Sequence, residues 1–135
     1  MHDAVEQLFR PYGPVLGKQA NVSVAASSAH VELGADADYA PIVTAISKGE
    51  LLELSADDDV GYRWSTAASG ETVALTATAT NGTAAHQCKR LYAGERVVER
   101  PPPGTLGIVL IGAVATVLRI TVCSRRPEDL LKLNA

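Results

Sequence analysis

Aromatic residues are scarce in this chain of 135 residues, which holds four Tyr, one Trp and one Phe. A core without many large rings has to be built from small and β-branched side chains, and these suit closely stacked β-sheets. The few large rings are expected inside, because a core of small residues needs them there. The length fits a single domain.

A concentrated basic stretch is also missing, and the formal charge is −3. Binding to a phosphate backbone needs such a stretch, so nucleic acid is not an expected direct partner. The N-terminus has acidic residues where a secretory signal has basic ones, and no apolar segment of signal type follows. We therefore expect synthesis in the cytoplasm, where Cys88 and Cys123 stay reduced as structural thiols.

One apolar run, residues 106–122, has the composition of a membrane span but not its length. A spanning helix needs about 20 apolar residues, and Arg119 interrupts this run. Two strands joined by a turn near Gly112 explain the segment better. The run therefore predicts no membrane partner.

Groups for catalysis and cofactor binding are few. The three histidines are far apart in the sequence, and there is no nucleophile elbow, phosphate-binding glycine loop or two-histidine metal helix. Three consecutive carboxylates, residues 57–59, cannot all face one ion, so they indicate a solvated turn and not a calcium loop. The sequence predicts a protein that is not an enzyme and needs no cofactor.

Short segments with a two-residue period follow one another from residue 21 onward, separated by Gly, Asp and Pro turn signals. Their number and spacing predict an all-β fold, a β-sandwich or jelly roll. The expected strands cover residues 21–27, 30–33, 41–47, 50–54, 60–64, 72–80, 87–92, 96–100, 106–111 and 114–123.

The last of these segments makes a specific prediction about side-chain direction. Since successive residues of a strand face opposite sides, Leu118, Ile120 and Val122 should point into the core. Arg119 and Thr121 should then face outward.

The chain divides into an N-terminal arm (1–20), a β domain (21–123) and a C-terminal tail of one or two helical turns (124–135). The arm and the tail carry apolar residues without a core of their own, a pattern typical of subunits that reach onto neighbours. These segments supply the candidate assembly-interface residues, which are Phe9, Arg10, Tyr12, Leu130, Leu131 and Leu133.

Tyr62 and Trp64 lie two residues apart and so share one face of a strand. Two interpretations remain open. The rings can plug the core, or they can form a platform on which a sugar stacks.

The segment LYAGERVVERPPPGTLGIVLIGAVATVLRITVC, which starts at Leu91, and the earlier pieces NVSVAASSAHVEL and VGYRW carry a family resemblance. Together they resemble the turn and strand pattern of small tailed-phage virion proteins, which include capsid decoration (cement) proteins. The resemblance spans about residues 21–123, judged by the strand pattern.

The resemblance implies a structural protein on the capsid exterior that bridges neighbouring major capsid subunits. Its implied partners are the major capsid protein, other copies of itself in a dimer or trimer, and a head fibre. The alternative is a tail- or head-fibre-associated module that binds a host surface glycan through Tyr62 and Trp64. A bacterial enzyme or sensor of the jelly-roll type is a third hypothesis.

Overall fold

The computed structural model describes residues 12–75 and 88–125, and this part of the chain is mostly β with one short α-helix. A 3-10 turn, η1 (Ala37–Tyr39), leads into helix α2 (Ala40–Ser47) between the second and third strands. The strands are β1 (Tyr12–Val24), β2 (Ala29–Glu32), β3 (Leu51–Ala56), β4 (Val60–Ser65), β5 (Lys89–Leu91), β6 (Arg96–Glu99), β7 (Gly107–Gly112) and β8 (Thr116–Arg125).

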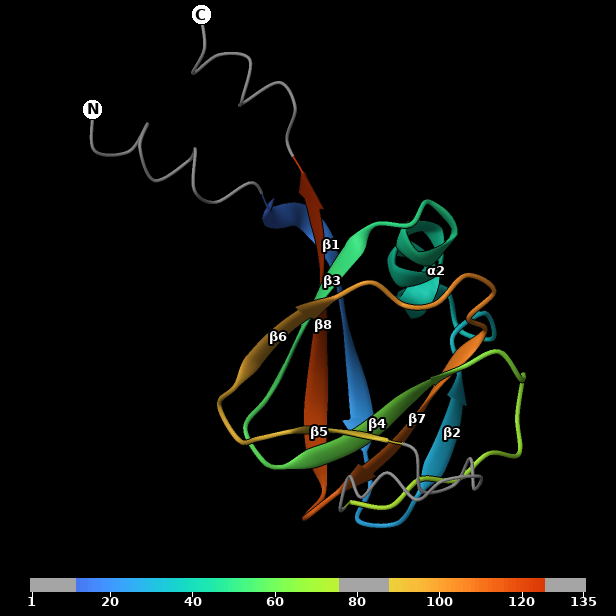
Figure 1. The fold of residues 1–135 in the computed structure, drawn as a ribbon, viewed down its shortest axis with the longest axis vertical. Helices are drawn as coiled ribbons and strands as arrows, with labels where there is room; N and C mark the ends of the chain where they lie inside the picture. The colour runs from blue at the N-terminus through green and yellow to red at the C-terminus, as the bar shows by residue number, and fades with distance from the viewer. Residues whose placement is uncertain (1–11, 76–87, 126–135) are drawn as a thin grey trace, which may run out of the picture.

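The strands form two four-stranded antiparallel sheets (Figure 1). Sheet A has the order β1-β8-β3-β6, and sheet B has the order β2-β7-β4-β5. The chain changes sheet at every connection between successive strands except the one from β4 to β5. This arrangement agrees with the all-β prediction, and it places residues distant in sequence next to each other.

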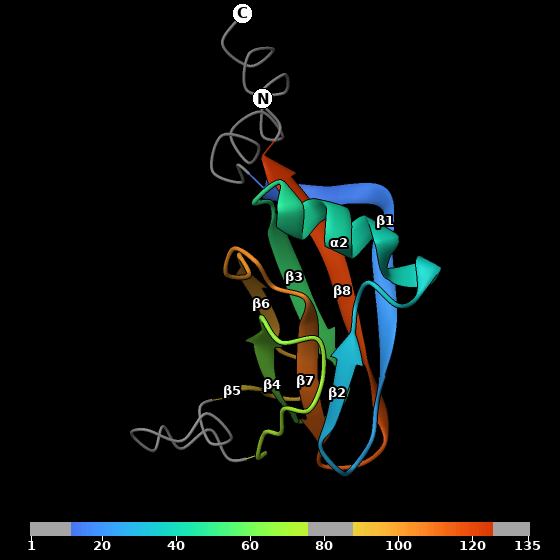
Figure 2. The same ribbon diagram turned by 90° about the vertical axis from the view of Figure 1, so that its right-hand side faces the viewer.

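One apolar core joins the two sheets, because the same buried cluster receives side chains from the strands of both. Helix α2 lies across one end of sheet A (Figure 2) and adds Ile42, Ala45 and Ile46 to the core. The large fully buried side chains on the strands are Val22 of β1, Leu52 and Leu54 of β3, Val60 and Tyr62 of β4, Leu91 of β5, Ile108 and Leu110 of β7, and Leu118 and Ile120 of β8.

The prediction for the last strand is confirmed. Leu118, Ile120 and Val122 are each 0% exposed, whereas Arg119 is exposed and Thr121 is half-buried. The apolar run at residues 106–122 forms most of β7 and β8, joined by a turn after Gly112, as expected. Within the residues that the structure describes, no helix has the length and hydropathy that crossing a membrane requires.

One expected strand is wrong, and so is the described part of a second. Residues 41–47 form most of α2, because Pro41 fits a helical first turn and Ile42, Ala45 and Ile46 recur at helical spacing. A short apolar run of this kind does not separate a strand from a helix by its period alone. Of the expected strand at 72–80, residues 72–75 are not in a strand, and the remainder lies outside the described residues.

The sheet also extends beyond the expected domain limits. Pairing between β1 and β8 starts at Tyr12, so residues 12–20, assigned to the arm, form part of β1. Ala20 from this stretch belongs to the buried core, and β8 continues to Arg125. The candidate interface residues Phe9, Arg10, Leu130, Leu131 and Leu133 lie outside the described residues.

Candidate functional site

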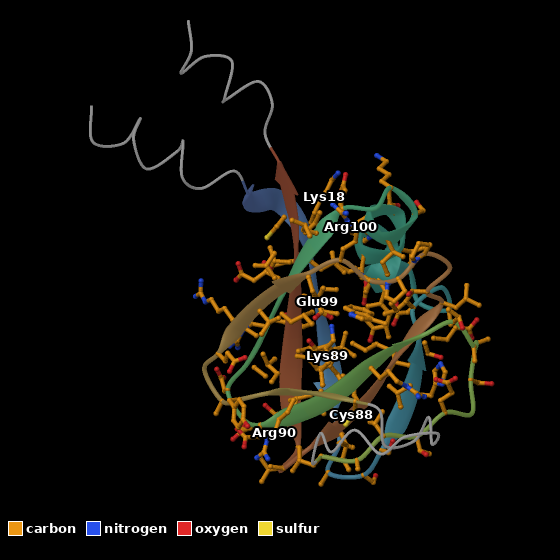
Figure 3. All side chains as sticks on the ribbon, in the orientation of Figure 1. Lys18, Cys88, Lys89, Arg90, Glu99 and Arg100 are labelled. Carbon is orange, nitrogen blue, oxygen red and sulfur yellow. The ribbon has the colours of Figure 1, made fainter. Side chains whose placement is uncertain are left out.

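A polar cluster joins the edge strand β6 of sheet A to two strands of sheet B, and we call it the Glu99 cluster. Tyr62 Oη donates a hydrogen bond to Glu99 Oε2 at 2.9 Å, and Trp64 Nε1 donates to Glu99 Oε1. Lys89 Nζ lies 2.9 Å from the same Oε2 atom. Figure 3 shows Lys89 and Glu99 in the space between β6 and the β4–β5 pair.

The two-residue period of β4 explains why both rings reach one carboxylate. Tyr62 and Trp64 point to the inner side of sheet B, where their rings meet edge to face with centroids 6.4 Å apart. Tyr62 is 1% exposed. Burial raises the pKa of the Tyr62 hydroxyl well above its ordinary value, and the negative charge of Glu99 raises it further. Tyr62 therefore remains a hydrogen-bond donor at physiological pH.

This arrangement fits a structural junction between the sheets. The Glu99 carboxylate already accepts bonds from three side chains and is only 12% exposed. The ring of Tyr62 is buried and is therefore not available for stacking on a sugar. Of the two interpretations left open by the sequence, the structure matches the core plug.

A second polar cluster, which we call the Asp59 cluster, lies at the end of the molecule where the turn after β3 leads into β4. Arg90 Nη2 lies 2.6 Å from Asp59 Oδ2, and the Ala93 amide donates to Asp59 Oδ1 at 2.8 Å. The Ala113 amide donates to the backbone oxygen of Asp59 at 3.0 Å. Asp59 thereby joins the β3–β4 turn, in which it lies, to the β5–β6 and β7–β8 turns. Its hydrogen bond with Arg90 lowers the pKa of the Asp59 carboxyl.

An exposed aromatic ring accompanies this cluster. The Arg90 guanidinium lies 4.9 Å from the centre of the Tyr92 ring, and Tyr92 is 54% exposed. The sequence analysis did not predict this cluster, because its members are separated by long stretches of chain and no local spacing indicates that they meet. Only the β4–β5 pairing brings Arg90 beside the strand that follows Asp59.

Asp57, in the same turn, does not converge with Asp59. Asp57 Oδ1 instead lies 2.8 Å from Arg119 Nη2 of β8, and that hydrogen bond lowers the pKa of Asp57. Neighbouring carboxylates thus hold different arginines. Over residues 12–75 and 88–125, no group of three or more His, Cys, Asp or Glu side chains is placed to hold a metal ion.

The two cysteines are not joined in a disulfide. Cys88 Sγ donates to the Ala74 backbone oxygen at 2.8 Å. Cys123 is 3% exposed, and burial raises the pKa of its thiol. The hydrogen bond of Cys88 and the burial of Cys123 both fit the expected role of structural thiols.

The described chain begins and ends at one place. Tyr12 of β1 is the register partner of Arg125 of β8. Both residues lie at the end of sheet A that is opposite the Asp59 cluster, as the upper ends of β1 and β8 show in Figure 1. The segments before Tyr12 and after Arg125, which carry most of the candidate interface residues, therefore join the domain side by side.

We compared the chain with protein-family models, with curated proteins and with solved structures, and none of the three comparisons gave a match.

Proposed function

We propose that this chain is a structural virion protein that binds the outer surface of a phage capsid and bridges neighbouring major capsid subunits. In this role it reinforces the shell against the pressure of the packaged DNA. It acts through buried contact area and not through chemistry, so the proposal includes no cofactor and no catalytic residue.

The strand order supports the finer fold within this proposal, an eight-stranded jelly roll. In such a fold two antiparallel sheets face each other across one core, and viral capsid proteins and lectins both use it. The orders β1-β8-β3-β6 and β2-β7-β4-β5 have this form. Fold analogy alone does not decide function, so the site has to carry the argument.

The observation that carries the proposal is the pairing of Tyr12 with Arg125. It brings together the two points at which the segments before Tyr12 and after Arg125 join the domain, and these segments carry Phe9, Arg10 and the tail leucines in the sequence. Two short segments anchored at one point can engage one partner together, and the second contact then forms at high effective concentration. The opposite end, with Tyr92 and Val114 more than half exposed, would then face away from the shell.

The glycan-binding alternative through Tyr62 and Trp64 receives less support from the structure than the capsid proposal. Tyr62 is buried and Trp64 donates to Glu99 on the inner side of sheet B. A glycan-binding role would need a different surface of this protein. Counting copies per particle separates the two proposals, because a capsid cement is present in hundreds of copies and a fibre component in few.

Binding of the purified protein to capsids that lack it tests whether the two terminal segments hold it on the shell. The full chain should co-sediment with such particles, and Phe9→Ala combined with Leu131→Ala should weaken binding. The double variant Asp57→Ala and Arg119→Ala is the matched control, because it changes two exposed residues of the body far from Tyr12 and Arg125. Equal binding of both double variants would exclude the terminal segments as the anchor.

A further inference from the structure

Each sheet has two edge strands, which are β1 and β6 in sheet A and β2 and β5 in sheet B. The outer backbone N–H and C=O groups of an edge strand can pair with a strand of another chain. Proteins usually protect such edges with short length, charged side chains, proline or a bulge. The four edges of this protein differ in how well they are protected.

Three of the four edges carry such protection. β5 has three residues, of which Lys89 and Arg90 are charged. β2 has four residues and ends at the exposed Glu32. β6 also has four residues, and it begins with the exposed Arg96 and ends with Glu99, whose carboxylate turns inward. These edges are too short and too charged to accept another strand readily.

β1 is protected only over its first part. Pro14 and Lys18 lie there, and the register with β8 shifts between Pro14 and Gln19. Residues 19–24 read QANVSV, with no charge, no proline and no register shift. Along these residues β1 pairs with β8 on one side, and within the described residues no strand pairs with it on the other (Figure 2). This part of β1 is an open and unprotected edge.

The side chains of residues 19–24 suit pairing with an identical strand. Buried apolar residues alternate strictly with exposed residues that are polar but uncharged, and these are Ala20, Val22 and Val24 against Gln19, Asn21 and Ser23. In an antiparallel pair centred on Asn21, Gln19 of one copy lies opposite Ser23 of the other, and Ala20 lies opposite Val22. Polar residues thus meet polar residues, and apolar residues meet apolar ones.

Charge also favours a second copy at this edge. The whole chain has a formal charge of −3, so two copies repel each other over most contact surfaces. Residues 19–24 contain no charged side chain, so two identical edges meet there without like charges in direct opposition.

We propose that residues 19–24 of β1 join two copies of this protein in a symmetric dimer. The two β1 strands pair antiparallel, and the two four-stranded sheets A become one continuous sheet. The contact uses the same patch on both copies, as a twofold axis requires. Main-chain hydrogen bonds hold the pair, and the alternation of side chains sets its register.

Sedimentation of the purified full chain over a range of concentrations tests this proposal. The wild type should form dimers. Asn21→Lys should raise the dissociation constant by about tenfold or more, because it places like charges opposite each other at the twofold axis. Asn21 is exposed, so this variant should fold, which a circular dichroism spectrum checks.

Two matched controls each place a lysine at an exposed valine on the outer side of sheet A. Val98→Lys changes β6, the other edge of the sheet, and Val117→Lys changes the residue of β8 beside Ser23. Both should weaken the dimer far less than Asn21→Lys does. Amide hydrogen exchange locates the contact independently: exchange of residues 19–24 should slow as the concentration rises, and exchange of β6 should not.

A wild-type chain that stays monomeric up to about 1 mM would overturn the proposal. So would a closed trimer, which has no twofold axis, or a dimer that Asn21→Lys leaves intact. Equal weakening by Val98→Lys or Val117→Lys would place the contact on β6 or on the outer side of sheet A instead. If Asn21→Lys does not fold, the exchange of residues 19–24 at low and high concentration still decides. These measurements use purified protein without particles, so their results do not depend on the proposed function.

Discussion

The outer sides of the two sheets differ in how far they are exposed to solvent. Burial alternates along β3 of sheet A, where every second residue is buried. In sheet B, by contrast, the first three residues of β4 and the first four of β7 are all buried. One side of sheet A is therefore exposed to solvent. The outer side of sheet B is covered by residues 66–75, the strap, whose Glu71 and Val73 amides donate to His30 and Ser28.

The difference follows from the sequence of the strands. A half-buried strand alternates apolar and polar residues, while a strand buried on both sides is a continuous apolar run. β8 alternates, as in Leu118-Arg119-Ile120, and β7 reads GIVLIG. Ion pairs such as Arg119 with Asp57 lie on the solvent-exposed side of sheet A, which we call its open side.

The largest expected effect contrasts two neighbours on β8. Ile120→Ala should lower the free energy of unfolding by about 2–5 kcal/mol, because it leaves a cavity in the shared core. Arg119→Ala should cost far less, since Arg119 is exposed and its ion pair is on the surface. Denaturant unfolding measures both. Equal losses would show that the outer side of sheet A is not the open side.

A matched pair of valines compares the two outer sides directly. Val109 on sheet B is 0% exposed, and Val117 on sheet A is 41% exposed. Val109→Ala should destabilise the protein by about 2–3 kcal/mol, from two lost methyl groups and the cavity they leave. Val117→Ala should change stability by less than about 0.5 kcal/mol, as at most surface sites. A similar cost for both valines in thermal or denaturant unfolding would remove the distinction between the sheets.

Glycine substitutions test the contact between strap and sheet. Gly61→Ala should cost about 1–3 kcal/mol, because the new methyl group overlaps the strap backbone. Gly34 has no atom within 4 Å of an added Cβ and serves as the control. Gly34→Ala should be neutral or slightly stabilising by denaturant unfolding. If Gly61→Ala is equally well tolerated, the strap does not lie on β4.

The smallest expected effect concerns the ion pair on the open side. The hydrogen bond from Arg119 lowers the pKa of Asp57 below its ordinary value. The folded state therefore gains stability from this carboxylate at pH values above the unfolded pKa, and the gain is lost as the pH falls through the folded pKa. Arg119→Ala should raise the Asp57 pKa toward its ordinary value in an NMR titration. An unchanged pKa would mean that the pair does not persist in solution.

Much of the β architecture could be predicted from the sequence, because alternation and turn residues are local signals. The direction of Ile120 and Arg119 followed from the period of two. The helix at 41–47 could not be separated from a strand, since its apolar run is too short for its period to decide. The strap was also missed, as Gly61 makes room for residues that local patterns placed in a strand.

The candidate sites could also be predicted only where they depend on local patterns. The shared direction of Tyr62 and Trp64 followed from their spacing, but Glu99, their common acceptor, comes from an edge strand of the other sheet. The Asp59 cluster likewise depends on tertiary contacts between connections that are far apart in sequence. The meeting of the chain ends at Tyr12 and Arg125 required the β1–β8 register, which no local pattern contains.

The most direct test of the proposed function is a melting curve of DNA release from phage particles with and without this protein. Particles that lack it should assemble with normal shell geometry but release DNA at a lower temperature. Adding the purified protein should restore the higher temperature, because binding to the intact particle stabilises it by mass action. Identical curves, together with a loss of host adsorption, would contradict shell reinforcement and favour the host-binding alternative.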